Sequence, residues 1–195
     1  MRHPQIIPIP SYEQQLARTA NRKANAKENT MGRKTLFLII LVASRVGFSI
    51  DDFSLKWMNH EGGAATFNSA EQLGPVFVIE AYFQTCPHCN VNAPAVDSLA
   101  AKYKSNSRVQ VLDVGIDRTD SSYQTWISEH NPNHPVLNDS TRALIKQLGT
   151  TGYPSTYVIN CRGKIIYDTS GEWDSSARTE IQNAIETALD APCPL

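Results

Sequence analysis

The sequence has no long apolar run, few cysteines and no glycine-rich nucleotide-binding loop. Its apolar run at 36–43 is far shorter than the roughly 20 residues that a membrane-spanning helix needs. Four cysteines in 195 residues are too few for a domain built on disulfides, although an even number allows two pairs. Because no internal repeat and no phosphate-binding glycine motif is present, a repeat array and a nucleotide-binding domain have no support.

Basic residues are concentrated at the N-terminus, and the rest of the chain is acidic. Residues 1–49 hold eight of the 18 Lys and Arg but two of the 19 Asp and Glu, which leaves ten and seventeen in 50–195, a net charge of −7. An acidic domain without basic clusters argues against nucleic acid as a partner. The length predicts one domain with appendages.

The first 49 residues divide into two parts. Residues 1–30 are polar and contain three prolines near their start, so we interpret them as a disordered extension, or as a segment upstream of a true start at Met31. Residues 31–49 combine two basic residues, the apolar run and small residues, which is typical of a secretory signal peptide. An uncleaved N-terminal anchor and a buried helix are the alternatives. We therefore expect a protein exported to the periplasm, either free or anchored to the membrane.

The most informative stretch is 76–90, an apolar run that ends in Cys86-Pro87-His88-Cys89. The run is rich in β-branched and aromatic side chains, which predicts a strand buried on both faces, and a helical period follows Cys89. Cys86 then lies at a helix N-terminus, where unpaired N–H groups and the helix dipole favour a thiolate. Pro87 suits the first helical position, because its missing N–H would be unpaired there.

These features predict a redox site. We expect Cys86 to be the exposed nucleophile and Cys89, one helical turn inward, to be the buried resolving thiol. A zinc half-site and two unreactive cysteines are the alternatives. Zinc needs four ligands, and Pro132 separates His130 from His134, so we place both histidines in a loop rather than at a metal. The prediction includes no metal and no cofactor.

Periodic patterns along the rest of the chain predict an α/β order of strands and helices around a central sheet. Gly62-Gly63 marks the turn of a hairpin ahead of the main strand. The predicted elements are a hairpin at 53–67, strands at 76–83, 108–116, 135–137, 155–160 and 163–167, and helices after Cys89, at 121–130, from Asp139 or Ser140 to Gly149, and around 181–189.

Residues 50–195 resemble the thioredoxin fold, with C-x-x-C after a buried strand and Tyr153-Pro154 before the penultimate strand. Pro94, eight residues after Cys86, matches the helix-kinking proline of that family. The resemblance implies a central mixed sheet flanked by helices, here with an N-terminal hairpin extension and an inserted strand and helix. It also implies that Pro154 is a cis proline packed against the active-site cysteines. From the residues alone, Pro154 marks only a turn at a strand entrance.

Two groups within this family match different parts of the chain. The segment 78–89 resembles the active site of DsbA-type oxidases, including an acid, Glu80, six residues before the first cysteine. The 68 residues from Cys86 to Pro154 are too few for the helical domain of those oxidases and fit the smaller insertion of TlpA/ResA-like proteins. That second group usually has Trp where this chain has Thr85.

The resemblance implies an exported thiol–disulfide oxidoreductase that exchanges disulfides with cysteine-containing protein substrates. A membrane redox partner would recycle its C-P-H-C pair, and we expect a monomer. The DsbA-like active site favours an oxidant, whereas the TlpA-like scaffold favours a reductant, for example in cytochrome c maturation. A copper-binding chaperone is the alternative from another class, although copper carriers of this fold usually have C-x-x-x-C.

His88 and Glu80 are predicted to tune the cysteines. His88 can stabilise the Cys86 thiolate and make the disulfide more oxidising, unless it only faces solvent. Glu80 is an acid in an apolar strand, on the face of Cys86 by strand alternation, and can shuttle protons to Cys89. A partly exposed Glu80 near the strand edge is the alternative. The residues predicted to border the substrate groove are Phe83, Gln84, Thr85 and Tyr153.

The other two cysteines lie at a hairpin turn, Cys161, and beyond the last helix, Cys193. In the thioredoxin fold these places lie at the same pole, so the resemblance implies a structural disulfide, with two free thiols as the alternative. Such a bond closes a loop of about thirty residues and stabilises by roughly 3–4 kcal/mol. It also agrees with export to an oxidising compartment.

Overall fold

The computed structural model describes residues 49–63, 65–72 and 75–193, all of which belong to one compact unit of the chain. The predicted disordered extension and all but the last residue of the predicted signal segment lie outside the described residues. Within the described ranges, no helix combines the length and the apolar character needed to cross a membrane.

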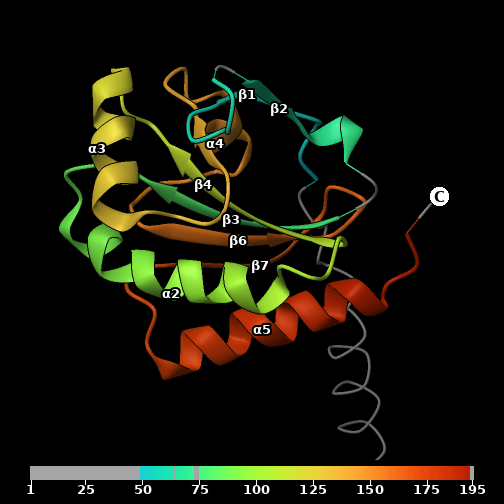
Figure 1. Ribbon diagram of the computed structural model, residues 1–195. Coiled ribbons are helices and arrows are strands. Elements are labelled where there is room, and N and C mark those ends of the chain that lie inside the picture. Colours follow the sequence, from blue (N-terminus) through green and yellow to red (C-terminus); the bar gives the residue numbers. More distant parts are fainter. Residues whose placement is uncertain (1–48, 64, 73–74, 194–195) are drawn as a thin grey trace, which may run out of the picture. The chain divides into compact units, whose positions relative to one another are not determined.

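A seven-stranded sheet forms the centre of the fold, in the order β2-β1-β5-β4-β3-β6-β7 (Figure 1). Strands β3, β4 and β5 run parallel, and the other pairs are antiparallel. This mixed sheet with flanking helices confirms the predicted thioredoxin-like fold class. The strands are β1 (Ser54–Trp57), β2 (Ala65–Asn68), β3 (Val76–Tyr82), β4 (Val109–Gly115), β5 (Val136–Asn138), β6 (Ser155–Ile159) and β7 (Ile165–Ser170). The helices are α2 (Pro87–Tyr103), α3 (Asp120–His130), α4 (Ala143–Gln147) and α5 (Ser175–Asp190), with a 3-10 turn η1 (Ser69–Glu71).

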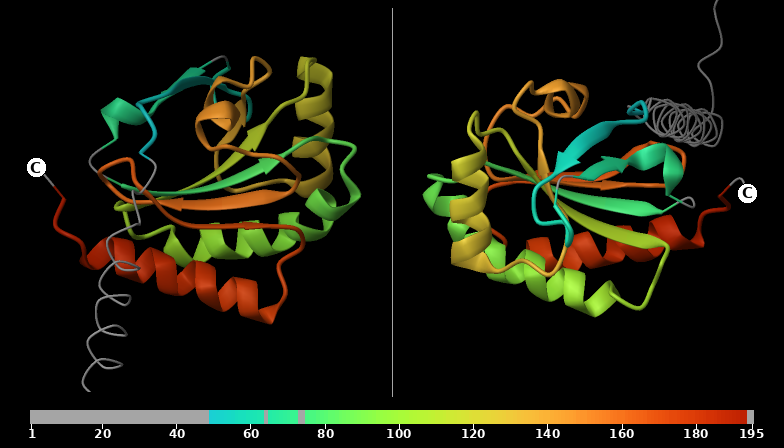
Figure 2. Two further views of the ribbon diagram at one scale, coloured as in Figure 1. Left: turned by 180° about the vertical axis from the view of Figure 1, so that it is seen from behind. Right: turned by 45° about the horizontal axis from the view of Figure 1, so that its top comes forward.

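Strand β3 is buried along its whole length because both of its faces are covered. Val76 and Val78 point to the face that α2 and α5 cover, where Ile181 of α5 packs. Phe77 and Ile79 point the other way, against the β1–β2 hairpin and α4. Figures 1 and 2 show α2 and α5 side by side under one face of the sheet. The alternation of a strand between two apolar layers explains why 76–82 reads as a continuous apolar run.

Several element boundaries differ from the sequence prediction, and the shifts at the starts of α4 and β7 have a local cause. Helix α4 begins at Ala143 rather than at 139 or 140, because Arg142 adopts a left-handed conformation with φ 60°. Asp139 still caps this helix, since its carboxylate accepts the N–H groups of Ala143 at 2.8 Å and Ile145 at 2.9 Å. Strand β7 begins at Ile165 because Gly163 is needed for the preceding turn: its φ is 73°, and a Cβ there would meet the Ile50 carbonyl oxygen at 2.7 Å.

Candidate active site

Cys86 lies at the start of helix α2, directly after β3. Its sulfur is joined to that of Cys89 by a disulfide and accepts the Cys89 N–H at 3.1 Å, so Cys86 is the N-cap of the helix. Pro87 occupies the first helical position, as the sequence predicts. The Cys86 sulfur therefore lies where free N–H groups and the helix dipole stabilise negative charge.

Cys86 is buried in the disulfide form, and the expectation that it is exposed is wrong for this state. Its exposed fraction is 2%, against 1% for Cys89. Both cysteines pack in an apolar cluster with Tyr82, and Phe83 and Tyr153 lie against that cluster. The rings of Phe83 and Tyr153 meet edge to face with centroids 5.6 Å apart. The disulfide is thus sheltered by aromatic side chains from β3 and from the loop before β6.

The loop before β6 contains the cis peptide bond that the resemblance implies. It joins Tyr153 to Pro154, and Pro154 itself is buried. The Pro154 carbonyl accepts the Gly171 N–H at 3.0 Å, which ties the loop to the end of β7. Tyr153, the residue before the cis bond, is the one that contacts the cysteine cluster.

Gln84 and Thr85 form the turn between β3 and the first cysteine. Thr85 is exposed, and Gln84 is half-buried. The Gln84 N–H donates to the Asp117 carboxylate at 2.9 Å, and its carbonyl accepts from the Asn90 side chain at 3.1 Å. These bonds hold the turn against the loop after β4 and against α2, next to the disulfide.

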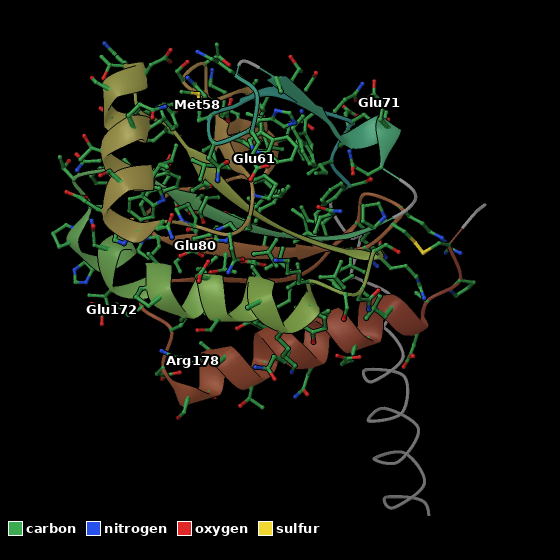
Figure 3. The ribbon with its side chains drawn as sticks, in the orientation of Figure 1. Met58, Glu61, Glu71, Glu80, Glu172 and Arg178 are labelled. Carbon is green, nitrogen blue, oxygen red and sulfur yellow. A yellow bond between two sulfur atoms is a disulfide. The ribbon has the colours of Figure 1, made fainter. Side chains whose placement is uncertain are left out.

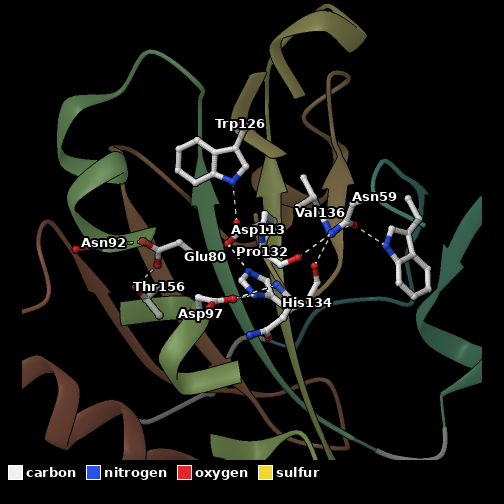
Figure 4. Close-up of polar contacts among 12 residues, drawn as sticks. Asn59, Glu80, Asn92, Asp97, Asp113, Trp126, Pro132, His134, Val136 and Thr156 are labelled. Atoms are coloured by element: carbon white, nitrogen blue, oxygen red, sulfur yellow. Dashed lines mark hydrogen bonds and ion pairs between the residues drawn. The ribbon is translucent and has the colours of Figure 1, made fainter. Parts of the chain in front are cut away.

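Glu80 lies at the centre of the sheet, so the alternative of a partly exposed acid at a strand edge is wrong. Its exposed fraction is 2%, and its neighbours are β4 on one side and β6 on the other. The carboxylate accepts bonds from Asn92 Nδ2 at 2.9 Å and from Thr156 Oγ1 at 2.6 Å (Figure 4). Burial raises the pKa of Glu80 from 4.5 to about 7, against the lowering effect of these two hydrogen bonds.

Replacing Glu80 by glutamine is expected to flatten the pH dependence of stability. The folded protein binds this proton more tightly than the unfolded chain, so its contribution is present below about pH 4.5 and is lost as pH rises through 7. Urea unfolding of Glu80→Gln and of the parent at pH 5 and pH 8 measures this, with the parent losing roughly 1–3 kcal/mol more over the interval. An equal loss in both proteins would show that Glu80 titrates normally.

His88 is paired with an acid that sequence reasoning missed. Its Nδ1 lies 2.6 Å from Oε1 of Glu172, which belongs to the loop between β7 and α5 and is labelled in Figure 3, and both side chains are exposed. Among the described residues, no hydrogen bond joins His88 to Cys86. Gly171 and Trp173 fix the position of Glu172, because the Asn92 side chain binds the carbonyl of the first at 3.1 Å and the N–H of the second at 2.9 Å.

A second buried polar group on the same face of the sheet also escaped the sequence prediction. His134 lies in the loop between α3 and β5, as the sequence predicts, but it is only 7% exposed and faces Asp113 of β4. Trp126 of α3 donates to the other oxygen of Asp113 at 2.9 Å. His130 is the last residue of α3 and binds Asn90 at 2.8 Å. An acid in an apolar strand, the signal that singled out Glu80, was also present at Asp113.

Cys161 and Cys193 are joined by a disulfide between the β6–β7 turn and the segment after α5. Two arginines contact the end of α5 and that segment: Arg108 donates to the Leu189 carbonyl of the last turn of α5 at 2.8 Å, and Arg162 donates to the Pro192 carbonyl at 2.7 Å. The end of the described chain is therefore held to the sheet by one covalent and two polar links. Over residues 49–63, 65–72 and 75–193, no group of three or more His, Cys, Asp or Glu side chains is placed to hold a metal.

The sequence and the structure are both similar to proteins of one class, the thioredoxin-fold proteins. The AhpC/TSA family model matches residues 46–168. The thiol-disulfide oxidoreductase ResA of Oceanobacillus iheyensis is 27% identical in an alignment 160 positions long, which covers 73% of this chain and 82% of that protein. A structure described as a thiol:disulfide interchange protein DsbE from Chlorobium tepidum has a TM-score of 0.63 at 21% identity, over 73% of this chain and 96% of that one.

A solution structure described as a thioredoxin from Neisseria meningitidis has a TM-score of 0.62 at 26% identity, over 75% of this chain and 94% of that one. The chain belongs to the AhpC/TSA family and is a thiol–disulfide oxidoreductase on a TlpA/ResA-like scaffold.

Proposed function

We propose that this oxidoreductase is exported and exchanges disulfides with cysteine-containing protein substrates through Cys86 and Cys89. The observation that carries the proposal is the position of the Cys86 sulfur, which caps α2, accepts the Cys89 N–H and is bonded to the Cys89 sulfur. A helix N-terminus lowers the pKa of a thiol. Cys86 is therefore the nucleophile when the pair is reduced, and Cys89 is the resolving thiol.

The exchange cycle balances over two thiol–disulfide steps. In the reductive direction, the Cys86 thiolate attacks one sulfur of a substrate disulfide, and the other substrate sulfur leaves as a thiolate. Cys89 then loses its proton to Glu80 and attacks the Cys86 sulfur, which releases the second substrate thiolate. Two electrons pass from the cysteine pair to the substrate, and a thiol donor must restore the pair. The oxidative direction runs these steps in reverse.

The substrate groove is proposed to run over the rim of the disulfide, which consists of Phe83, Gln84, Thr85 and Tyr153. Phe83 and Tyr153 pack against the cysteine cluster, and Thr85 and Pro87, the two neighbours of Cys86 in the chain, are exposed. A substrate that approaches the Cys86 sulfur has to cross this rim. Gln84 and Pro154 hold the two sides of the rim in place through the backbone contacts described above.

For the direction of transfer we propose a reductant, with cytochrome c maturation as the candidate pathway. A free histidine between the cysteines would stabilise the thiolate and favour an oxidant. Here His88 is paired with the Glu172 carboxylate at 2.6 Å, which offsets its positive charge. The ResA-like scaffold supports the same direction.

The reduction potential of the Cys86–Cys89 pair tests the direction. We would equilibrate the protein with glutathione buffers, using a variant that lacks Cys161 and Cys193 to keep the signal to one pair. A value nearer −270 mV is the expected result for a reductant, whereas a value nearer −120 mV would assign the DsbA-like role of a disulfide donor.

Replacing Glu172 by glutamine is expected to make the pair more oxidising. The amide keeps a hydrogen-bond partner for His88 but removes the negative charge, so a protonated His88 is free to stabilise the Cys86 thiolate. Exposed ion pairs contribute about 0.2–1 kcal/mol, which corresponds to a rise of roughly 5–20 mV. Glu180→Gln, an exposed acid on α5, is the matched control. A potential that does not move in Glu172→Gln would leave the C-P-H-C sequence itself as the determinant.

Export to the periplasm, with recycling by a membrane redox partner, completes the proposal. The disulfide between Cys161 and Cys193 supports it, since such bonds persist in oxidising compartments. Cell fractionation of the full chain with a C-terminal tag, followed by protease treatment of intact spheroplasts, tests this placement. Protection from the protease would locate the protein in the cytoplasm and overturn the export proposal.

A further inference from the structure

Glu80 has a second carboxylate beside it in the sheet. In the parallel register of β3 and β4, Glu80 pairs with Asp113, and both residues are 2% exposed. Their side chains share the face covered by α2, because residues paired in this register point the same way. A charged Asp113 beside Glu80 raises the pKa of Glu80, so ionisation of Glu80 is favoured by a nearby cation.

His134 is positioned to supply that cation. Its side chain is 4% exposed, with Nε2 3.3 Å from Asp113 Oδ1 and Nδ1 3.6 Å from Asp97 Oδ1 (Figure 4). The two ring nitrogens thus face two carboxylates, an arrangement that suits the imidazolium form, in which both nitrogens carry a proton. Burial lowers the pKa of His134, but the charges of Asp113 and Asp97 outweigh it and raise the pKa above 6.5.

The two carboxylates around His134 are fixed by other bonds. Trp126 Nε1 donates to Asp113 Oδ2 at 2.9 Å, which leaves Oδ1 for the histidine. Asp97, on α2, accepts the Asn133 N–H at 3.0 Å and is partly exposed, with 35% of its side chain open to solvent. Both acids are thus anchored independently of the histidine, and the imidazole lies between them at ion-pair distance, although among the described residues neither ring nitrogen makes a hydrogen bond.

The remaining titratable groups around this cluster do not replace His134. Tyr82 of β3 has a buried hydroxyl for which the described residues offer no hydrogen-bond partner, and burial, with a smaller effect of the Asp113 charge, raises its pKa. The cavities beside His134 are also lined by Tyr103 at the end of α2, by Lys104 after it, and by His60 and Glu61 of the β1–β2 loop. Within the described part of the chain, His134 is the basic side chain that makes an ion pair with Asp113.

We propose that His134 is a positioning residue that neutralises Asp113 and thereby allows Glu80 to be a carboxylate at neutral pH. In the exchange cycle, Glu80 has to be ionised before it can take the proton of Cys89, and an unpaired Asp113 would keep it protonated. The inference rests on the proposed function insofar as the proton of Glu80 is used in exchange. The effect of the His134 and Asp113 charges on the ionisation of Glu80 does not depend on that function, because it is a property of the folded chain.

The test is the titration of the Glu80 carboxyl carbon, followed by NMR in the oxidised full chain labelled with [13C]glutamate and assigned with Glu80→Gln. In His134→Gln the midpoint of this titration is expected to rise by about one pH unit, because the compensating charge is gone. His60→Gln, an exposed histidine on the neighbouring loop, should leave it unchanged. A midpoint in His134→Gln that equals the parent value or falls below it would overturn the proposal.

Asp113→Asn and His134→Gln together separate a charge effect from a packing defect, because a charge effect moves their midpoints in opposite directions. Its amide oxygen can still accept the Trp126 N–H, but the negative charge beside Glu80 is lost, so the midpoint is expected to fall. Loosened packing would instead admit water and lower the midpoint in both variants. A midpoint that rises or stays unchanged in Asp113→Asn would overturn the proposal.

Exchange kinetics distinguish this inference from the proposed function. If the parent shows no disulfide exchange, the proposed function fails whatever the titrations show. If exchange is normal and the His134→Gln midpoint does not rise, only the role of His134 fails. When both hold, the pH profile for release of substrate from the mixed disulfide should move upward in His134→Gln by the same amount as the Glu80 midpoint.

Discussion

Cys86→Ser is expected to abolish disulfide exchange, with activity in an insulin-reduction assay reduced to the uncatalysed rate. A serine hydroxyl is not ionised at neutral pH, and an oxygen cannot take the place of sulfur in the exchange. The side chain would still cap α2, since serine is among the preferred N-cap residues, so the fold should persist. Loss of activity with an unchanged circular dichroism spectrum therefore shows that the nucleophile, and not the fold, has been lost.

Two further variants make this test specific. Cys89→Ala keeps the nucleophile but removes the resolving thiol, so it should accumulate a mixed disulfide with its substrate, visible by mass spectrometry. The double variant Cys161→Ala/Cys193→Ala should keep its exchange activity, because that disulfide lies on other elements. Exchange that persists in Cys86→Ser would reject Cys86 as the nucleophile.

Removing the disulfide between Cys161 and Cys193 is expected to lower the free energy of unfolding by about 3–4 kcal/mol. The bond spans 32 positions of sequence, so breaking it returns a long loop to the unfolded ensemble. For a domain of this size the loss corresponds to a fall in Tm of roughly 6–15 °C. Thermal unfolding of Cys161→Ala/Cys193→Ala against the parent measures it.

The two arginines near this disulfide provide its control. Arg162→Gln removes the bond to the Pro192 carbonyl while keeping the covalent link, and should cost about 1 kcal/mol or less. A double cysteine variant as stable as the parent would mean that the polar contacts of Arg108 and Arg162 alone hold the C-terminal segment.

The sheet and the cysteine pair could be predicted from the sequence because their signals are local. The apolar run at 76–83 can bury all of its side chains only if both faces of the strand are covered. The C-x-x-C motif that follows places a redox-active cysteine pair at the start of the next helix. The predicted start of α4 lies a few residues too early. The Asp139 side chain accepts the Ala143 N–H at the start of the helix, but the left-handed Arg142 interrupts the helical backbone between them, and hydrophobic periodicity carries no information about that conformation.

The partners of the charged residues could not be predicted, because they depend on which strands and loops come together. His88 and Glu172 are 84 positions apart, and His134 reaches Asp97 and Asp113 from a proline-containing loop. The exposure of Cys86 depends on tertiary contacts as well, since Phe83 and Tyr153 lie close to the disulfide only in the folded chain.

The shelter over the disulfide has a kinetic consequence. Because Cys86 is 2% exposed, we expect a freely diffusing small thiol such as glutathione to react with the disulfide slowly, so that equilibration with glutathione buffers needs long incubation. A macromolecular partner that binds the rim gains binding free energy, which can offset the cost of moving Tyr153 or Phe83 aside. The Cys86–Cys89 disulfide then becomes accessible to that partner. We therefore expect the oxidised protein to exchange its disulfide faster with a partner that binds this surface than with the small thiols around it, even where the small thiols are more concentrated.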